Sequence, residues 1–248
     1  MSAPAAAVIA TGLRKSFGQL EVLKGVDIQV EAGTVFALLG SNGAGKTTTV
    51  NILTTLLKPD AGQARVAGFD VVRQPRQVRE AITVTGQNVT VDPILTGLEN
   101  LALIATLRHI ARPKRVAAEL AERFGLAKAS NKPAGTYSGG MKRRLDIAMS
   151  LIGQPEVIFL DEPTTGLDPA GRREVWAAIE QLAEAGATVV LTTQQMEEAA
   201  KLADGIVLLH DGVIAAKGTP DDILRAAGGA PDLETAFLAL TADGGGRS

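Results

Sequence analysis

TVFALLGSNGAGKT, residues 34–47, is a short apolar run that ends in glycine and is followed by a glycine-rich turn. A continuous apolar run of this length is typical of a strand that is buried on both faces of a sheet. Helical spacing from about Lys46 to Leu57 predicts that a helix comes next. Phosphate-binding loops lie between such a strand and such a helix, and residues 40–47 fit their pattern G-x-x-x-x-G-K-[ST]. The stretch therefore predicts a phosphate site.

The residue types in this loop suit phosphate binding. Glycines let backbone N–H groups converge on phosphate oxygens, and the Lys46 ammonium neutralises the β- and γ-phosphates. The Thr47 hydroxyl is a ligand for Mg²⁺. A glycine-rich helix N-terminus without a ligand is the alternative, and the flanking strand and helix argue against it. The residues expected to surround the phosphates are Gly40, Ser41, Asn42, Gly43, Ala44, Gly45, Lys46, Thr47 and Thr48.

A second apolar strand ends in two adjacent carboxylates. VIFLDEP, residues 157–163, places Asp161 and Glu162 directly after the apolar residues. Next to a phosphate-binding loop, Mg²⁺ and an attacking water both need carboxylates, so we expect Asp161 to hold the metal through water and Glu162 to be the general base. Acids are also favoured at helix N-termini, so the pair becomes a strong signal only in combination with the loop.

A second glycine pair occurs in YSGGM, residues 137–141, just before a segment with helical spacing. Ser138 alone is equally well explained as a helix N-cap. Gly139 and Gly140 open the backbone for the close approach of an anion. Together they predict a second phosphate-binding helix terminus in the same chain.

The order of the predicted elements indicates an α/β protein. Two alternating apolar segments, residues 8–13 and 22–30, predict an antiparallel pair of strands. Helical segments follow between about residues 90 and 152. After them, β-rich runs alternate with helices expected over residues 170–185 and 195–202, as in a parallel sheet with crossover helices. Functional residues are therefore expected at the C-terminal ends of these strands.

Composition restricts the function classes. The hydrophobic content of 46% suffices for a packed core, and we expect one domain over residues 1–240, with a helical subdomain at about residues 90–152, and a flexible tail over residues 241–248. The net charge of −2 gives no field for collecting polyanions, so generic nucleic-acid binding is disfavoured. The absence of cysteine excludes disulfides and thiol nucleophiles and fits a cytosolic protein. No secretory signal or membrane-spanning segment is predicted.

Four motifs occur in the order GSNGAGKTT, YSGGM, VIFLDEP and TTGLDP. With them the chain resembles the nucleotide-binding ATPase subunit of ABC transporters over essentially its whole length. The resemblance implies a P-loop NTPase fold of the ABC-ATPase type, with a RecA-like core, an N-terminal antiparallel β-subdomain and a helical subdomain. It also implies ATP and Mg²⁺ as cofactors. In that family the signature serine and glycines close over the nucleotide of a second copy, so a head-to-tail dimer, expected to be a homodimer, and a separate membrane permease are the implied partners.

Three further residues take roles from this resemblance. Phe17 is similar to the aromatic residue that stacks on adenine, although a core phenylalanine is the alternative. Gln87, in VTGQN, resembles the glutamine that touches Mg²⁺ and leads into the helical subdomain. Asp168, in GLDP, resembles the aspartate at the dimer seam, and it equally suits the cap of the following helix.

The chain departs from the common family pattern at two positions. Met141 replaces the glutamine that usually ends the signature, and Gln194 stands where most members have a histidine. Glutamine in that position is usual in the drug-resistance group typified by the daunorubicin/doxorubicin exporter ATPase, which the chain resembles. An amide both donates and accepts hydrogen bonds but does not titrate near neutrality, so we expect Gln194 to position the γ-phosphate. We expect Gln195 to be a solvated residue at the start of a helix, and residues 142–144 to be a solvated helix face.

These observations predict an ATP-hydrolysing subunit that drives export of a hydrophobic drug, antibiotic or lipid-like compound through a separate permease, at the cytoplasmic face of the membrane. One alternative is an ABC ATPase that acts on ribosomes or DNA, although such proteins usually carry two ATPase halves or long coiled coils. A nucleotide-dependent regulator without turnover is another, and the presence of Lys46, Asp161 and Glu162 argues against it.

Overall fold

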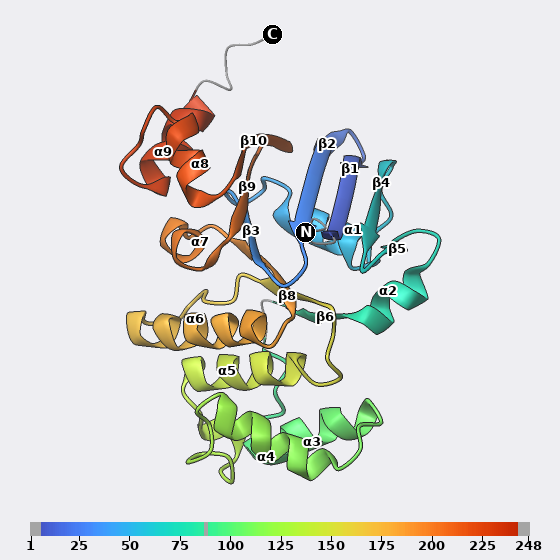
Figure 1. Ribbon diagram of the computed structural model, residues 1–248, viewed down its shortest axis with the longest axis vertical. Coiled ribbons are helices and arrows are strands. Elements are labelled where there is room, and N and C mark those ends of the chain that lie inside the picture. Colours follow the sequence, from blue (N-terminus) through green and yellow to red (C-terminus); the bar gives the residue numbers. More distant parts are fainter. Residues whose placement is uncertain (1–5, 87–88, 243–248) are drawn as a thin grey trace, which may run out of the picture.

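The computed structural model describes residues 6–86 and 89–242, which form two β-sheets and the helices packed around them (Figure 1). The central sheet has the strand order β10-β9-β3-β8-β7-β6. Strands β9, β3, β8, β7 and β6 run parallel to one another, whereas β10 pairs antiparallel to β9. The strands of this sheet are β3 (Val35–Leu39), β6 (Ile82–Thr85), β7 (Val157–Asp161), β8 (Thr188–Thr193), β9 (Gly205–His210) and β10 (Val213–Gly218).

An antiparallel sheet of four strands lies beside it, in the order β2-β1-β4-β5. Its strands are β1 (Ala6–Phe17), β2 (Leu20–Glu31), β4 (Ala61–Val66) and β5 (Phe69–Asp70). The antiparallel pairing of β1 and β2 confirms the sequence prediction. The strand β4 was not predicted from the sequence, and its first three residues are exposed. Gly62 has a φ of 83°, and a Cβ there would lie 2.3 Å from the Gly12 carbonyl oxygen, so glycine permits the close approach of β4 to β1.

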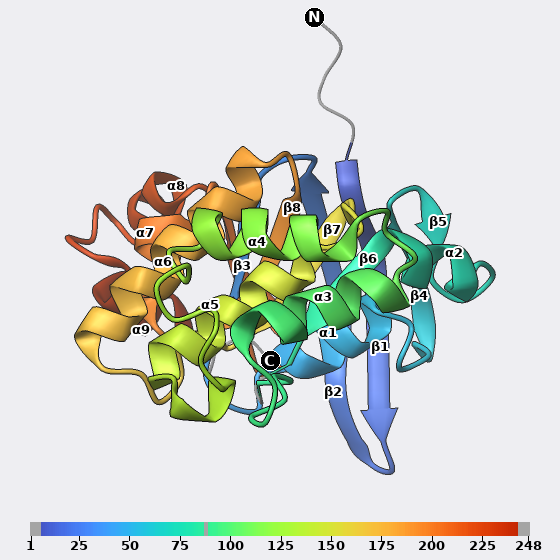
Figure 2. The same cartoon turned by 90° about the horizontal axis from the view of Figure 1, so that it is seen from below.

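The helices cover the central sheet on both faces. They are α1 (Lys46–Leu53), α2 (Pro75–Ala81), α3 (Gly97–Leu107), α4 (Pro113–Arg123), α5 (Gly139–Ser150), α6 (Pro169–Glu184), α7 (Met196–Leu202), α8 (Pro220–Ala226) and α9 (Leu233–Ala242). Figure 1 shows α5 and α6 stacked beside the central sheet with α3 and α4 beyond them, and Figure 2, seen from below, shows α3 and α4 in front. The helix α1 ends at Leu53, four residues earlier than expected, and α9 continues through Ala242, two residues into the expected tail.

The alternating side chains of β3 explain why this strand reads as a continuous apolar run. Val35, Ala37 and Leu39 pack into a core that contains α5, α6 and α7. Phe36 and Leu38 point to the opposite face and pack into a second core with α1 and the antiparallel sheet. Both faces of the strand are therefore buried, as in other parallel sheets that carry helices on both sides.

Among the residues that the structure describes, no helix is both long enough and apolar enough to cross a membrane.

The burial of β8 generates a prediction about stability. Leu191 lies in the middle of this strand and is fully buried, so Leu191→Ala is expected to lower the free energy of unfolding by about 2–5 kcal/mol. Leu107, on α3, is 65% exposed, and Leu107→Ala makes the same chemical change at the surface, where we expect an effect within about 0.5 kcal/mol. Chemical denaturation followed by circular dichroism measures both, and equal losses would rule out β8 as the centre of the core.

Candidate functional site

The register of the central sheet brings three sequence motifs to one edge. Leu39, which precedes the glycine-rich loop, pairs with Thr193, and Asp161 pairs with Thr192. Both pairings extend past the strands, because the Gly40 amide donates to the Thr193 carbonyl oxygen over 3.3 Å and the Glu162 amide donates to the Thr192 carbonyl oxygen over 3.1 Å. The loop, the adjacent carboxylates and the polar end of β8 therefore meet at the carboxyl edge of the sheet, where ligands bind in open α/β sheets.

The glycines of the loop are required by its backbone geometry. Gly43 and Gly45 have φ values of 83° and 107°, which side chains rarely tolerate. Gly40 needs to be glycine for another reason, because a Cβ there would lie 2.3 Å from the Leu209 carbonyl oxygen. Ala44 is buried against the second core, and Gly45 directly precedes α1. The glycines thus determine the conformation of the loop. Of the residues expected around the phosphates, the exposed ones are Ser41, Asn42, Gly43 and Thr47, and Thr48 is half-buried.

The ammonium of Lys46 lies inside this loop. It donates hydrogen bonds to the carbonyl oxygens of Gly40 and Ser41, over 2.8 and 3.0 Å, and it lies 3.9 Å from Glu162 Oε1. Burial lowers the pKa of Lys46, and the carboxylates of Glu162 and Asp161 oppose this shift. The expected phosphate ligand and the expected base are therefore neighbours.

The two carboxylates are held by β8. Thr192 donates its hydroxyl hydrogen to Asp161 Oδ1, and both its hydroxyl and its carbonyl oxygen accept from the Glu162 amide over 3.1 Å. Glu162 has a φ of 45°, a left-handed conformation that costs of order 1–3 kcal/mol for a residue other than glycine. Thr165 Oγ1 donates to Glu162 Oε2 over 3.1 Å. Neighbouring structure thus fixes a strained residue at the position expected for the base.

The donor set at this edge suits Mg²⁺. The Thr47 hydroxyl is exposed at the start of α1, and Asp161 is only partly buried, so both are accessible. Hydroxyl and carboxylate oxygens are hard ligands, and Mg²⁺ is usually bound by one or two such groups together with phosphate oxygens and waters. Gln87, the third residue expected near the metal, lies outside the described residues.

Gln194 and Gln195 have different surroundings after β8. Gln194 is exposed directly after the strand. Gln195 is half-buried, its amide N–H donates to Thr193 Oγ1 over 2.9 Å, and its Oε1 accepts from Arg172 Nη1 over 3.1 Å. The prediction that Gln195 is a solvated helix residue is therefore wrong, because Arg172 ties it to α6.

The second glycine pair forms a separate hollow of about 270 Å³. Ser138 accepts a hydrogen bond from the Met141 amide over 3.2 Å, and Asp168 accepts one from Gly171 over 2.8 Å, so each caps a helix, as the simpler alternatives predicted. Both residues are also exposed. Close packing requires Gly140, since a Cβ there would lie 3.1 Å from the Gly171 Cα. The residues that line the hollow are Ser138, Gly139, Gly140, Gly166, Leu167, Asp168, Ala170, Gly171 and Glu174, and none belongs to the loop of residues 40–48.

Phe17 is 51% exposed at the end of β1. The alternative of a core phenylalanine is therefore wrong. The Lys15 ammonium lies over the ring, 5.7 Å from its centre.

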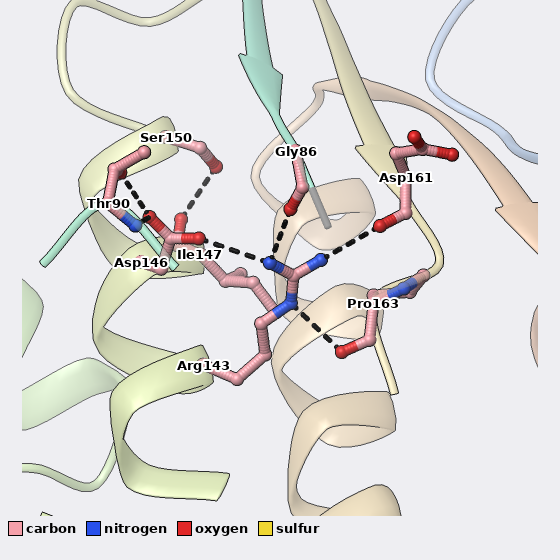
Figure 3. Close-up of polar contacts among 8 residues, drawn as sticks. All are labelled: Gly86, Thr90, Arg143, Asp146, Ile147, Ser150, Asp161 and Pro163. Carbon is pink, nitrogen blue, oxygen red and sulfur yellow. Dashed lines mark hydrogen bonds and ion pairs between the residues drawn. The ribbon is translucent and has the colours of Figure 1, made fainter. Parts of the chain in front are cut away.

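The expectation of a solvated face over residues 142–144 is also wrong. Arg143 is only 3% exposed, and its guanidinium donates to backbone carbonyl oxygens beside the carboxylates and to the buried Asp146 (Figure 3). Burial lowers the pKa of Arg143 and raises that of Asp146, and their mutual attraction opposes both shifts. The available sequence signal was an aspartate between the apolar residues Leu145 and Ile147, three residues after an arginine.

Known proteins share this arrangement. Residues 23–165 match the family model of the ABC transporter. The chain is 51% identical over 225 residues to the daunorubicin resistance ATP-binding protein DrrA2 of Streptomyces coeruleorubidus, covering 90% of this chain and 70% of that protein.

Solved structures agree with the sequence match. The ATP-binding subunit of an ABC transporter superposes with a TM-score of 0.81 and 28% identity, over 95% of this chain and 99% of that one. A dimeric ATP-binding cassette in a post-hydrolysis state, bound to ADP and Pi, has a TM-score of 0.73 and 25% identity, over 86% of this chain and 98% of that one.

These matches confirm the predicted α/β fold of the ABC-ATPase type, with its RecA-like core and antiparallel β-sheet. The chain therefore belongs to the ABC transporter family, as one of its ATP-binding and ATP-hydrolysing subunits.

Proposed function

We propose that this chain hydrolyses ATP to energise the export of a hydrophobic drug, antibiotic or lipid-like compound through a separate membrane permease. The observation that carries the proposal is the meeting of Lys46, Asp161 and Glu162 at one edge of the sheet, with Lys46 Nζ 3.9 Å from Glu162 Oε1. The similarity to a daunorubicin resistance protein supports a drug as the cargo. The permease would hold the site for that cargo.

Each residue at the edge has a proposed task in hydrolysis. The backbone of residues 40–45 and the Lys46 ammonium would bind the phosphates, and the Phe17 ring would stack on adenine. Glu162 would accept a proton from the attacking water. Thr47 and Asp161, with Gln87, would hold Mg²⁺, which neutralises charge on the phosphates when bound.

The role proposed for Gln194 is positioning. Its place after β8 puts it at the same edge as Glu162, whose amide is bonded to Thr192. Gln194 has one carbonyl acceptor and two N–H donors, so it can bond to a γ-phosphate oxygen and to the attacking water at once. It cannot carry a proton at neutral pH, so the base remains Glu162.

The assembly we propose is a head-to-tail dimer of two copies of this chain on a permease at the cytoplasmic face of the membrane. Ser138 and the two following glycines line a hollow that shares no residue with the phosphate loop of residues 40–48. In a head-to-tail pair this hollow would close over the nucleotide of the partner, with Asp168 at the seam. The dimeric ATP-binding cassette with a TM-score of 0.73 supports such pairing.

An ABC ATPase that acts on ribosomes or DNA is the second candidate function. It is disfavoured because the net charge is −2, which provides no general attraction for nucleic acid. The third candidate, a regulator that does not turn ATP over, is disfavoured by the paired Lys46 and Glu162.

The variant Glu162→Gln tests the proposed function. We expect it to lower the ATP turnover number by about 10²–10⁴-fold, because general-base catalysis contributes factors of that size. Nucleotide affinity should stay within threefold, about 0.7 kcal/mol. Turnover is measured with the purified chain, and daunorubicin transport with the chain bound to its permease in vesicles. Glu197→Gln, an exposed carboxylate on α7, is the matched control and should keep both activities. Equal, negligible turnover in wild type and Glu162→Gln would support the regulator instead.

A second variant tests the role of Gln194. Gln194→Ala should lower the turnover number at least about tenfold, since removal of one positioning hydrogen bond in an active site costs this much or more. Wild type should show no rate inflection near pH ~6.5, the ordinary pKa of histidine, whereas Gln194→His should gain one. Gln195→Ala is the neighbouring control for stability. Unchanged maximal turnover in Gln194→Ala would exclude the positioning role.

A further inference from the structure

A buried ion pair on α5 contacts the backbone beside the proposed general base. Arg143 and Asp146 lie three residues apart, and Arg143 Nη1 donates to Asp146 Oδ2 over 3.2 Å. Their side chains are only 4% and 2% exposed. Replacing such a buried pair with apolar residues is often neutral or stabilising, so fold stability alone does not account for it. What the pair contacts indicates another role.

Two other hydrogen bonds of Arg143 go to the residues on either side of Glu162. Its Nε donates to the Pro163 carbonyl oxygen over 2.9 Å, and its Nη2 donates to the Asp161 carbonyl oxygen over 3.2 Å (Figure 3). The carbonyl groups of the residues before and after Glu162 are thus held by one planar guanidinium. Glu162 is also the residue with a φ of 45°, so this guanidinium stabilises a backbone conformation that glutamate does not adopt readily.

The same pair also contacts Gly86 and Thr90. Arg143 Nη1 donates to the Gly86 carbonyl oxygen over 2.8 Å. Asp146 Oδ1 accepts from the Thr90 amide over 3.3 Å and from the Thr90 hydroxyl over 2.6 Å. Residues on both sides of Gln87 are therefore bonded to α5 (Figure 3).

The helix α5 begins at Gly139, directly after the Ser138 cap. One helix thus joins the hollow at its N-terminus to the residues on either side of Glu162 and to Gly86 and Thr90. We infer that Arg143 and Asp146 are positioning residues, which hold Glu162 in place for hydrolysis and couple Gly86 and Thr90 to α5. The inference rests on the proposed function, because it assigns roles to residues that support the same site.

The test distinguishes a loss of Glu162 positioning from a loss of fold stability. Arg143→Lys keeps the charge, but an ammonium with three donors on one atom cannot serve four acceptors spread around a planar guanidinium. We expect its turnover number to fall at least about tenfold while the affinity for a fluorescent ATP analogue stays within about threefold. The double variant Arg143→Met/Asp146→Leu removes both charges. It should be more stable than Arg143→Met alone, because no unpaired charge stays buried, and yet remain as slow.

The control variant is Arg144→Lys. Arg144, the next residue of α5, donates to the Phe124 carbonyl oxygen and pairs with Glu174, away from Glu162. Arg144→Lys should lower the melting temperature without a tenfold loss of turnover. Recovery of turnover together with stability in the double variant, or near-normal turnover in Arg143→Lys, would overturn the inference. Absent turnover in wild type and all variants would instead contradict the proposed function.

Discussion

The site depends on two threonines at the end of β8. The Thr193 carbonyl oxygen accepts from the Gly40 amide at the start of the phosphate loop. Thr192 bonds to Asp161 through its hydroxyl and to the Glu162 amide through its hydroxyl and carbonyl oxygens. One strand end thus sets the relative position of the loop and the carboxylates. Because both threonines are buried, these hydrogen bonds are protected from competition with water.

Support for the strained Glu162 comes from two sides. Thr192 holds its amide from β8, and Arg143 on α5 holds the carbonyl groups before and after it. Precise placement of a general base requires such backing, since a small displacement from the attacking water costs much of the rate. The site is therefore built on a sheet and a helix.

The sequence was enough to predict the motifs and their meeting point. Apolar runs with glycine or acids at their ends predicted β3 and β7, and parallel pairing then places those ends together. Arg143 could not be found in this way, because most of its partners are backbone carbonyl oxygens of other segments. Every residue carries such a group, so the sequence does not show which of them an arginine contacts. The partner of Gln195 is the side chain of Arg172, and this contact depends on how α6 packs beside β8. The strand β4 was missed because it is mostly exposed.

The most direct test of this account is the ATP turnover of Thr192→Val. Valine has nearly the same shape, so the substitution removes the hydroxyl that bonds to Asp161 and to the Glu162 amide while keeping the buried volume. We predict a turnover number at least about tenfold lower with nucleotide affinity nearly unchanged. Thr188→Val, at the other end of β8, removes a hydroxyl that accepts from the Gly33 amide and should affect stability alone. Equal turnover in the two variants would contradict the account.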